Sequence, residues 1–162
     1  MSNKENSPFS FCSPLLESLA DGVFAVDLDW KIRVFNRAAE EITGIPRQDA
    51  LGRICCEVFR ASICETMCAL KQAMTTGDSV IDKAIFIVDG QGHRIPVSIS
   101  AAVIRDDNGN IVGGIETFRD LSREESLRQE LNRQFTFHDI ISRSPKMQSI
   151  FQILKPVSES HS

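Results

Sequence analysis

Residues 20–52, ADGVFAVDLDWKIRVFNRAAEEITGIPRQDALG, decide the fold of this 162-residue chain. From Gly22 to Asn36 apolar residues alternate around a break at Asp27–Trp30, which predicts two paired strands. Asn36 is typical of a helix N-cap, and the helix RAAEEITG that follows it is stopped by Gly44. PRQDALGR predicts a second short helix or turn. The stretch therefore predicts a strand pair followed directly by short helices.

Two further helices are predicted on either side of this stretch. SPLLESLAD, from Ser13, has a capping serine, a proline at the first helical position and an acidic residue in the first turns. SICETMCALKQAM is predicted to be helical from a Ser62 cap to about Met74, with Gly77 just past its end. Both segments are short, so we expect them to cover other elements.

After Gly77 the hydrophobic period changes from that of a helix to that of a strand. Residues 79–120 contain three strand-like runs, which are separated by the turn sequences DGQG and DDNGN. In the middle run one face is apolar, with Ile95, Val97, Ile99, Ala101 and Val103 on it. With the first two strands, these runs predict an α+β fold: a five-stranded antiparallel sheet with short helices on one face.

These segments resemble the PAS domain family, whose pattern is Asp-Gly, a strand, an Asp turn, and then Asn-x-Ala before a helix that ends in Thr-Gly. The matching positions here are Asp21, Gly22, Asp27, Asn36, Ala38, Thr43, Gly44 and Gly52. GNIVGGIETFRDLS is similar to the last PAS strand and its exit motif, with Asp120 present and Ser122 in place of the family's Thr. The resemblance covers residues 13–120 and implies a sensory domain that forms homodimers.

The flanking segments predict a larger protein around this domain. Residues 1–12 are polar and predicted to be disordered. Residues 121–136 predict a charged signalling helix, in which Leu127 and Leu131 share a narrow apolar face typical of a coiled-coil linker. We expect Asp120, Ser122 and these two leucines to relay the signal.

Residues 137–162, FHDIISRSPKMQSIFQILKPVSESHS, resemble the first helix of the AAA+ ATPase domain in sigma-54-dependent transcriptional activators. That resemblance implies a truncated ATPase domain here. In the full-length protein it implies an ATPase, a DNA-binding domain and sigma-54 RNA polymerase as partners. The chain has no G-x-x-x-x-G-K-[ST] sequence, so no ATP site is expected in this fragment.

Four of the five cysteines lie in GRICCEVFRASICETMC, residues 52–68. Cys64 and Cys68 are spaced i, i+4 on the predicted helix, which would place them on one face. Cys55 and Cys56 are adjacent, so at most one of them is expected to face the same centre. The segment also resembles a cysteine-bearing PAS variant found ahead of sigma-54 activators, with cysteines matched at 55, 64 and 68, and Cys56 as an addition.

Thiolate clusters suit an iron–sulfur cluster or zinc, and we expect Cys55, Cys64 and Cys68, possibly with Cys56, to bind such a cofactor. The spacing matches neither a zinc-ribbon pair nor a ferredoxin run. Two alternatives stay open: unliganded thiols that pack as small hydrophobic residues, and a thiol redox switch. An unknown small ligand, or a cofactor-free PAS module that only dimerises, is also compatible with the sequence.

Other candidate sites are weaker. Cys55 occupies the position of the adduct-forming cysteine of flavin-binding photoreceptors, but Ile54 replaces their Asn, so we do not expect flavin photochemistry. The acidic residues show no spacing typical of paired catalytic carboxylates, and a solvated face is expected for Glu57, Glu65, Asp82 and Glu116. His93 is the one histidine near the sensory domain's core in sequence; a surface position is expected for it, and a role as a fourth metal ligand is the alternative. No base is evident beside a cysteine, so we predict that the chain is not an enzyme.

The composition of the chain limits its possible binding partners and its expected location in the cell. The net charge of −4 lacks the basic excess of nucleic-acid-binding modules, and we expect no direct nucleic-acid binding. No apolar run approaches the roughly 18 residues of a membrane span, and the N-terminus lacks the apolar region of a secretory signal. We therefore expect a cytoplasmic protein that does not bind membranes, in a compartment where disulfides are uncommon and clustered cysteines more often bind metal or do redox chemistry.

Overall fold

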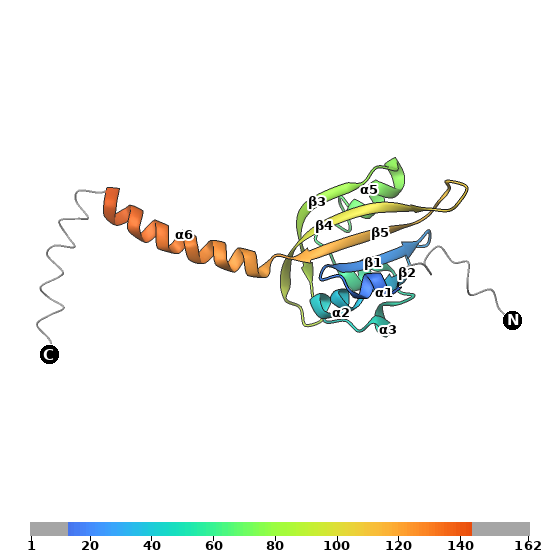
Figure 1. Ribbon diagram of the computed structural model, residues 1–162, viewed down its shortest axis with the longest axis horizontal. Helices are drawn as coiled ribbons and strands as arrows, with labels where there is room; N and C mark the ends of the chain where they lie inside the picture. The colour runs from blue at the N-terminus through green and yellow to red at the C-terminus, as the bar shows by residue number, and fades with distance from the viewer. Residues whose placement is uncertain (1–12, 144–162) are drawn as a thin grey trace, which may run out of the picture. The chain divides into compact units, whose positions relative to one another are not determined.

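The computed structural model describes residues 13–143, with side chains for residues 14–133. Its centre is a five-stranded antiparallel sheet in the order β2-β1-β5-β4-β3, which confirms the predicted α+β fold (Figure 1). β1 and β5 are neighbours although they lie far apart in the sequence, so the two ends of the domain meet at the middle of the sheet. The strands are β1 (Gly22–Asp27), β2 (Ile32–Phe35), β3 (Val80–Val88), β4 (Arg94–Arg105) and β5 (Ile111–Asp120).

Short helices fill the connection between β2 and β3 and pack on one face of the sheet (Figure 1). The main core lies between this face and the helices. Three of its rings, Phe24, Phe59 and Phe118, form a cluster with centroids 4.7 to 6.2 Å apart. The helices of the domain are α1 (Ser13–Glu17), α2 (Arg37–Thr43), α3 (Arg47–Ala50), α4 (Cys55–Phe59) and α5 (Ala69–Thr76).

Asn36 ends β2 and caps α2, as its position in the sequence predicts. Its side-chain oxygen, Oδ1, accepts hydrogen bonds from the backbone N–H groups of Val23 (2.8 Å) and Ala39 (2.9 Å). Its side-chain amide donates to the carbonyl oxygens of Leu16 and Asp21. One buried side chain therefore ties α1, β1 and α2 together.

Gly114 lets α5 lie directly on the sheet. A Cβ atom at this position would be 2.7 Å from Cδ1 of Leu70, much closer than side chains pack. α5 consequently crosses β4 and β5 at close range. Leu70, which makes this contact, also lines the cavity that is described below.

The prediction of one helix from Ser62 to Met74 is wrong. Residues 60–67 form no regular helix, with turns at 62–66. α5 begins only at Ala69, and Cys55–Phe59 is a separate helix that the sequence did not predict. Ser62 pairs with β3 instead of capping a helix: its Oγ accepts a hydrogen bond from the N–H of Phe86 at 3.5 Å, and its own N–H donates to the carbonyl oxygen of Phe86 at 2.9 Å. Cys64 and Cys68 are therefore not on one helix face.

The chain divides into two units, Met1–Ser122 and Arg123–Ser162. α6 (Ser122–Arg143) confirms a helix after the last strand, but it continues past residue 136 and includes the first residues of the predicted ATPase segment. The predicted disordered tail 1–12 and residues 144–162 lie outside the described residues. Within residues 13–143, no helix is both long enough and apolar enough to span a membrane.

Candidate ligand-binding site

A small cavity lies inside the domain, between the sheet and the segment that contains the cysteines. Its volume is about 20 Å³, which is enough for about one water molecule. Four of its lining groups carry chemistry that can bind a ligand: Cys55, Cys64, Cys68 and Glu116. The rest of the wall consists of Phe24, Phe59, Ala61, Ile63, Ala69 and Leu70.

α4 separates the two adjacent cysteines. Cys55 is buried at its first residue and lines the cavity, whereas Cys56 is exposed and does not. The chain is helical here rather than extended, and successive helical side chains also point in different directions. The structure thus brings Cys55 together with Cys64 and Cys68 and leaves Cys56 outside this group.

Cys64 and Cys68 approach the cavity from the α4–α5 segment, residues 60–67, and from the start of α5. Cys64 lies in a turn, where its N–H donates to the carbonyl oxygen of Ala61. Cys68 is the N-cap of α5, and its Sγ accepts a hydrogen bond of 3.5 Å from the N–H of Lys71. Both side chains are only partly buried, so the cavity is reachable from this side.

Glu116 is the residue that sequence reasoning missed. It is 4% exposed, on the central strand β5, and the expectation of a solvated face for it is wrong. Its neighbours across the sheet are Phe24 and Ala101, and it shares its face of β5 with Phe118. Alternation in IVGGIETFRD places Glu116 on the same face as Phe118, but Ile111 and Ile115 make the other face equally apolar, so the pattern alone does not show which face is buried.

The electrostatics of the cavity favour neutral groups. Burial raises the pKa of Glu116 to about 8. Burial, with a smaller effect of the neighbouring thiols, raises the pKa of Cys55 to about 12. Burial also raises the pKa of Cys64 to about 11. Because a thiolate is the reactive form, these thiols are poorly reactive at neutral pH unless a bound cation stabilises their anions.

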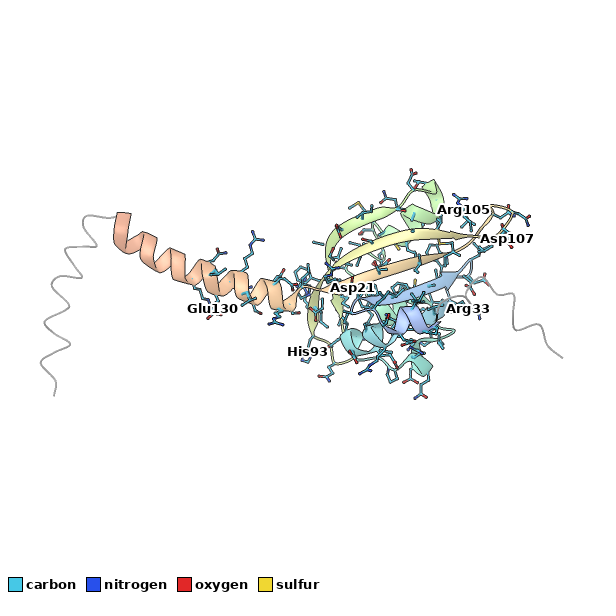
Figure 2. The ribbon with its side chains drawn as sticks, in the orientation of Figure 1. Asp21, Arg33, His93, Arg105, Asp107 and Glu130 are labelled. Atoms are coloured by element: carbon cyan, nitrogen blue, oxygen red, sulfur yellow. The ribbon has the colours of Figure 1, made fainter. Side chains whose placement is uncertain are left out.

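The donor chemistry of this site fits a thiophilic metal, but the spacing in this conformation does not complete a site. Within residues 14–133, no three His, Cys, Asp or Glu side chains are placed so that they could hold a metal ion. His93 does not contribute, since it lies in the turn between β3 and β4 and pairs with Asp89 at 3.1 Å. Figure 2 shows it at the opposite end of the sheet from Asp107.

Comparison with known proteins identifies the family. Residues 20–123 match the family model that is described as PAS domain, which is more than half of the chain. The chain belongs to the PAS domain family. The match begins just before β1 and ends just after β5, so it covers the whole sheet.

The curated relatives of this PAS domain are signal-transduction proteins. The chain is 26% identical over 157 residues to the "Signal-transduction and transcriptional-control protein" of Clostridium beijerinckii, which is 95% of this chain and 24% of the relative. It is 26% identical over 131 residues to the "Sensor protein CitS" of Halalkalibacterium halodurans, or 78% of this chain and 22% of the relative. The "Signal transduction histidine-protein kinase AtoS" of Escherichia coli is 27% identical over 116 residues, 71% of this chain and 19% of that kinase. The chain spans at most about a quarter of these relatives.

Solved structures show the same fold. The PAS domain of a Colwellia psychrerythraea protein has a TM-score of 0.60 at 18% identity, covering 67% of this chain and 92% of that one. The PAS domain of nitrogen regulation protein NR(II) from Vibrio parahaemolyticus has a TM-score of 0.56 at 17% identity, with coverage of 68% and 98%. An RNA-binding light-oxygen-voltage receptor has a TM-score of 0.60 at 20% identity, with coverage of 75% and 35%.

The exit from the PAS domain follows β5 directly. Asp120 ends the strand, and its carboxylate accepts a hydrogen bond of 2.8 Å from the N–H of Ser122, the first residue of α6. The N–H of Leu121 donates to the carbonyl oxygen of Pro96 on β4. Within α6, Leu127 and Leu131 lie one turn apart and are each about half exposed. The four predicted relay residues therefore follow one another along the strand end and the helix.

Proposed function

We propose that this chain is the sensory and dimerisation module of a cytoplasmic, sigma-54-dependent transcriptional regulator in a bacterium. The module senses a redox state, a metal or a small ligand. It does so at the cavity lined by Cys55, Cys64, Cys68 and Glu116. It passes the signal through β5 to α6. The observation that supports this most directly is that Glu116, which lines the cavity, lies on the strand that leads into α6.

The path from cavity to helix is short and passes through packed groups. Glu116 lines the cavity, Phe118 belongs to the aromatic cluster beside it, and Asp120 holds the first N–H of α6. Phe24 and Phe59 are shared between the cavity wall and the aromatic cluster. A ligand that changes the cavity must therefore shift groups that pack against β5, because close-packed interiors transmit displacement.

Support for a transcriptional role comes from the relative in Clostridium beijerinckii, whose printed name includes transcriptional control. Its match to this chain extends beyond the residues of the PAS domain, over 157 residues. The two sensor-protein relatives match a smaller share of the chain. The sigma-54 assignment rests on the resemblance of residues 137–162, and it makes the ATPase, the polymerase and the DNA-binding domain partners of the whole protein. The module itself has no catalytic role.

Among the possible signals, direct thiol oxidation is the least favoured. The raised pKa values of Cys55 and Cys64 keep both as thiols, and a thiol reacts slowly with oxidants. A bound ion or ligand explains why three thiols and a buried carboxyl line one cavity better than an empty core does. The alternative is a cofactor-free module that only dimerises, which the small size of the cavity favours.

A reporter assay in the longer protein tests this proposal. Transcription is measured with and without oxygen, and under zinc and iron depletion, for wild type, Cys64→Ala/Cys68→Ala and the exposed control Cys56→Ala. We expect the double variant to lose the response to the effective condition and the control to keep it. A wild-type response of the double variant would contradict sensing at this cavity. Reporter output that persists in a strain without sigma-54 would overturn only that assignment.

A further inference from the structure

Three residues other than glycine adopt the left-handed backbone conformation within residues 13–143. They are Trp30, Arg60 and Asp82, with φ angles of 63°, 46° and 49°. A residue with a side chain is strained in this conformation, because its Cβ atom lies too close to the following carbonyl oxygen. Such strain persists only where the surrounding structure imposes it, and it is common in elements that switch.

Two of these strained residues, Trp30 and Arg60, hold the two ends of α4. The carbonyl oxygen of Trp30 accepts a hydrogen bond of 3.0 Å from the N–H of Cys55, the first residue of α4. The ring of Trp30 packs against the core, which fixes its position. Arg60 is the C-cap of α4, and its Nε donates to the carbonyl oxygen of Glu57 at 3.1 Å. The helix is therefore strained at both ends.

The ends of α4 are also weaker than those of α2 and α5. Both of those helices have a side-chain N-cap, and each ends at a glycine, Gly44 or Gly77, which adopts the left-handed conformation without strain. α4 has no side-chain hydrogen bond at its N-cap, Ile54, and it ends at Arg60. A helix of five residues has little stability of its own and depends on packing. Of the two helices that line the cavity, α4 and α5, α4 is therefore held more weakly.

We propose that α4 is a gate for the cavity, and that it moves away from the sheet about Arg60 to admit a ligand larger than water. α4 contributes Cys55 and Phe59, its first and last residues, to the cavity wall. With α4 in place the cavity has space for about one water molecule, so a larger ligand requires a wall to move. Opening releases the strain at Arg60, which offsets part of the lost packing. This inference rests on the proposed function, because it describes how the same cavity admits its ligand.

The same movement reaches the strand that leads to α6. The ring centroid of Phe59 lies 5.1 Å from that of Phe24 and 4.7 Å from that of Phe118. Phe118 is on β5, two residues before Asp120, whose carboxylate accepts the hydrogen bond from the N–H of Ser122. An open α4 removes Phe59 from this aromatic cluster. The gate and the exit to α6 are therefore joined by the contact between Phe59 and Phe118.

Native-state hydrogen exchange of the whole chain tests the gate by comparing residues 55–59 with β4 and β5. We expect the amides of α4 to exchange faster than those of the two strands, because α4 opens without unfolding of the domain. Arg60→Gly should slow the exchange of α4 at least about threefold, because glycine removes the strain from the closed state. Arg60→Asn should act in the same direction, since asparagine tolerates the left-handed conformation better than arginine does.

Two controls separate strain at Arg60 from other effects. Arg60→Ala removes the hydrogen bond to Glu57 but keeps the strain, so it should not slow the exchange of α4. Asp82→Gly relieves the same kind of strain on β3, outside the cavity lining. It should leave the exchange of α4 unchanged, even though it stabilises the domain as a whole, because the opening of α4 does not release Asp82.

Exchange of α4 as slow as that of β4 and β5 would overturn the gate, and so would an equal slowing of α4 by Arg60→Gly and Asp82→Gly. The reporter assay separates this inference from the proposed function. If α4 opens as described but Cys64→Ala/Cys68→Ala keeps the wild-type response, the gate stands and sensing at the cavity fails. If that variant loses the response while α4 opens only with the whole domain, the proposed function stands and the gate fails.

Discussion

Asn36 is the residue whose role in stability is best defined. Its side chain makes four hydrogen bonds to backbone groups, and it is 1% exposed. Replacing it with alanine leaves two buried and two partly buried backbone hydrogen bonds unmade, so we expect Asn36→Ala to lower the free energy of unfolding by about 2–4 kcal/mol. Urea denaturation measures this. Asn108→Ala, an exposed turn position, should cost less than about 0.5 kcal/mol; equal losses in the two variants would contradict the network.

Glu116 should make the stability of the metal-free domain depend on pH. Its pKa is about 8 in the folded chain and ordinarily 4.5, so between these values the folded state retains a proton that the unfolded state has lost. The free energy of unfolding should therefore fall as pH rises from about 5 to 8, by at most about 1.4 kcal/mol per pH unit. The thiols of Cys55 and Cys64 titrate above this window.

Denaturation in chelator at several pH values tests this dependence. We expect Glu116→Gln to remove most of the fall and to be more stable than wild type at pH 8. Glu65→Gln is the matched control, because it removes a carboxylate that is exposed. A slope in Glu116→Gln equal to that of wild type would show that another group causes the pH dependence.

At the scale of elements, the contact between α5 and β5 depends on Gly114. An added methyl group would overlap with the side chain of Leu70, so Gly114→Ala should destabilise the domain by about 1–3 kcal/mol. Combining it with Leu70→Ala creates space for the new methyl group. A double-mutant cycle should therefore show a combined loss smaller than the sum of the single losses. Additive losses would mean that the helix does not rest on this glycine.

The sequence predicted the elements whose signals are local and missed those that tertiary contacts decide. The five strands followed from period-two alternation and turn residues, and α2 followed from Asn36 and Gly44. The start of α5 could not be predicted from local signals. It depends on the hydrogen bond from the N–H of Ser62 to the carbonyl oxygen of Phe86 on β3, which joins residues far apart in the sequence. The sequence singled out Cys55, Cys64 and Cys68, which line the cavity, and Cys56, which does not, but it did not single out Glu116. Its burial depends on which face of β5 meets the helices, and that depends on the register of the whole sheet.

At the scale of the whole molecule, we expect self-association to involve α6. Leu127 and Leu131 share one face of a charged helix and are each 53% exposed within the described residues. A second copy of the helix would cover them in a coiled coil. Leu127→Ser/Leu131→Ser should weaken the dimer at least about 10-fold in sedimentation experiments, whereas Arg128→Ser should not. An unchanged dimer would place the interface elsewhere.

The central claim is that the cavity and α6 are coupled through β5, and hydrogen exchange of α6 amides tests it most directly. The double variant Cys64→Ala/Cys68→Ala changes the cavity wall and replaces no residue of β5 or α6. Cys56→Ala controls for loss of a thiol outside the cavity, and Ile32→Val controls for loss of core stability at the far edge strand β2. We predict that the double variant changes exchange over residues 122–133 by roughly fivefold, which corresponds to about 1 kcal/mol, and that both controls leave it unchanged. Exchange of α6 that is the same in the double variant as in wild type would contradict the account.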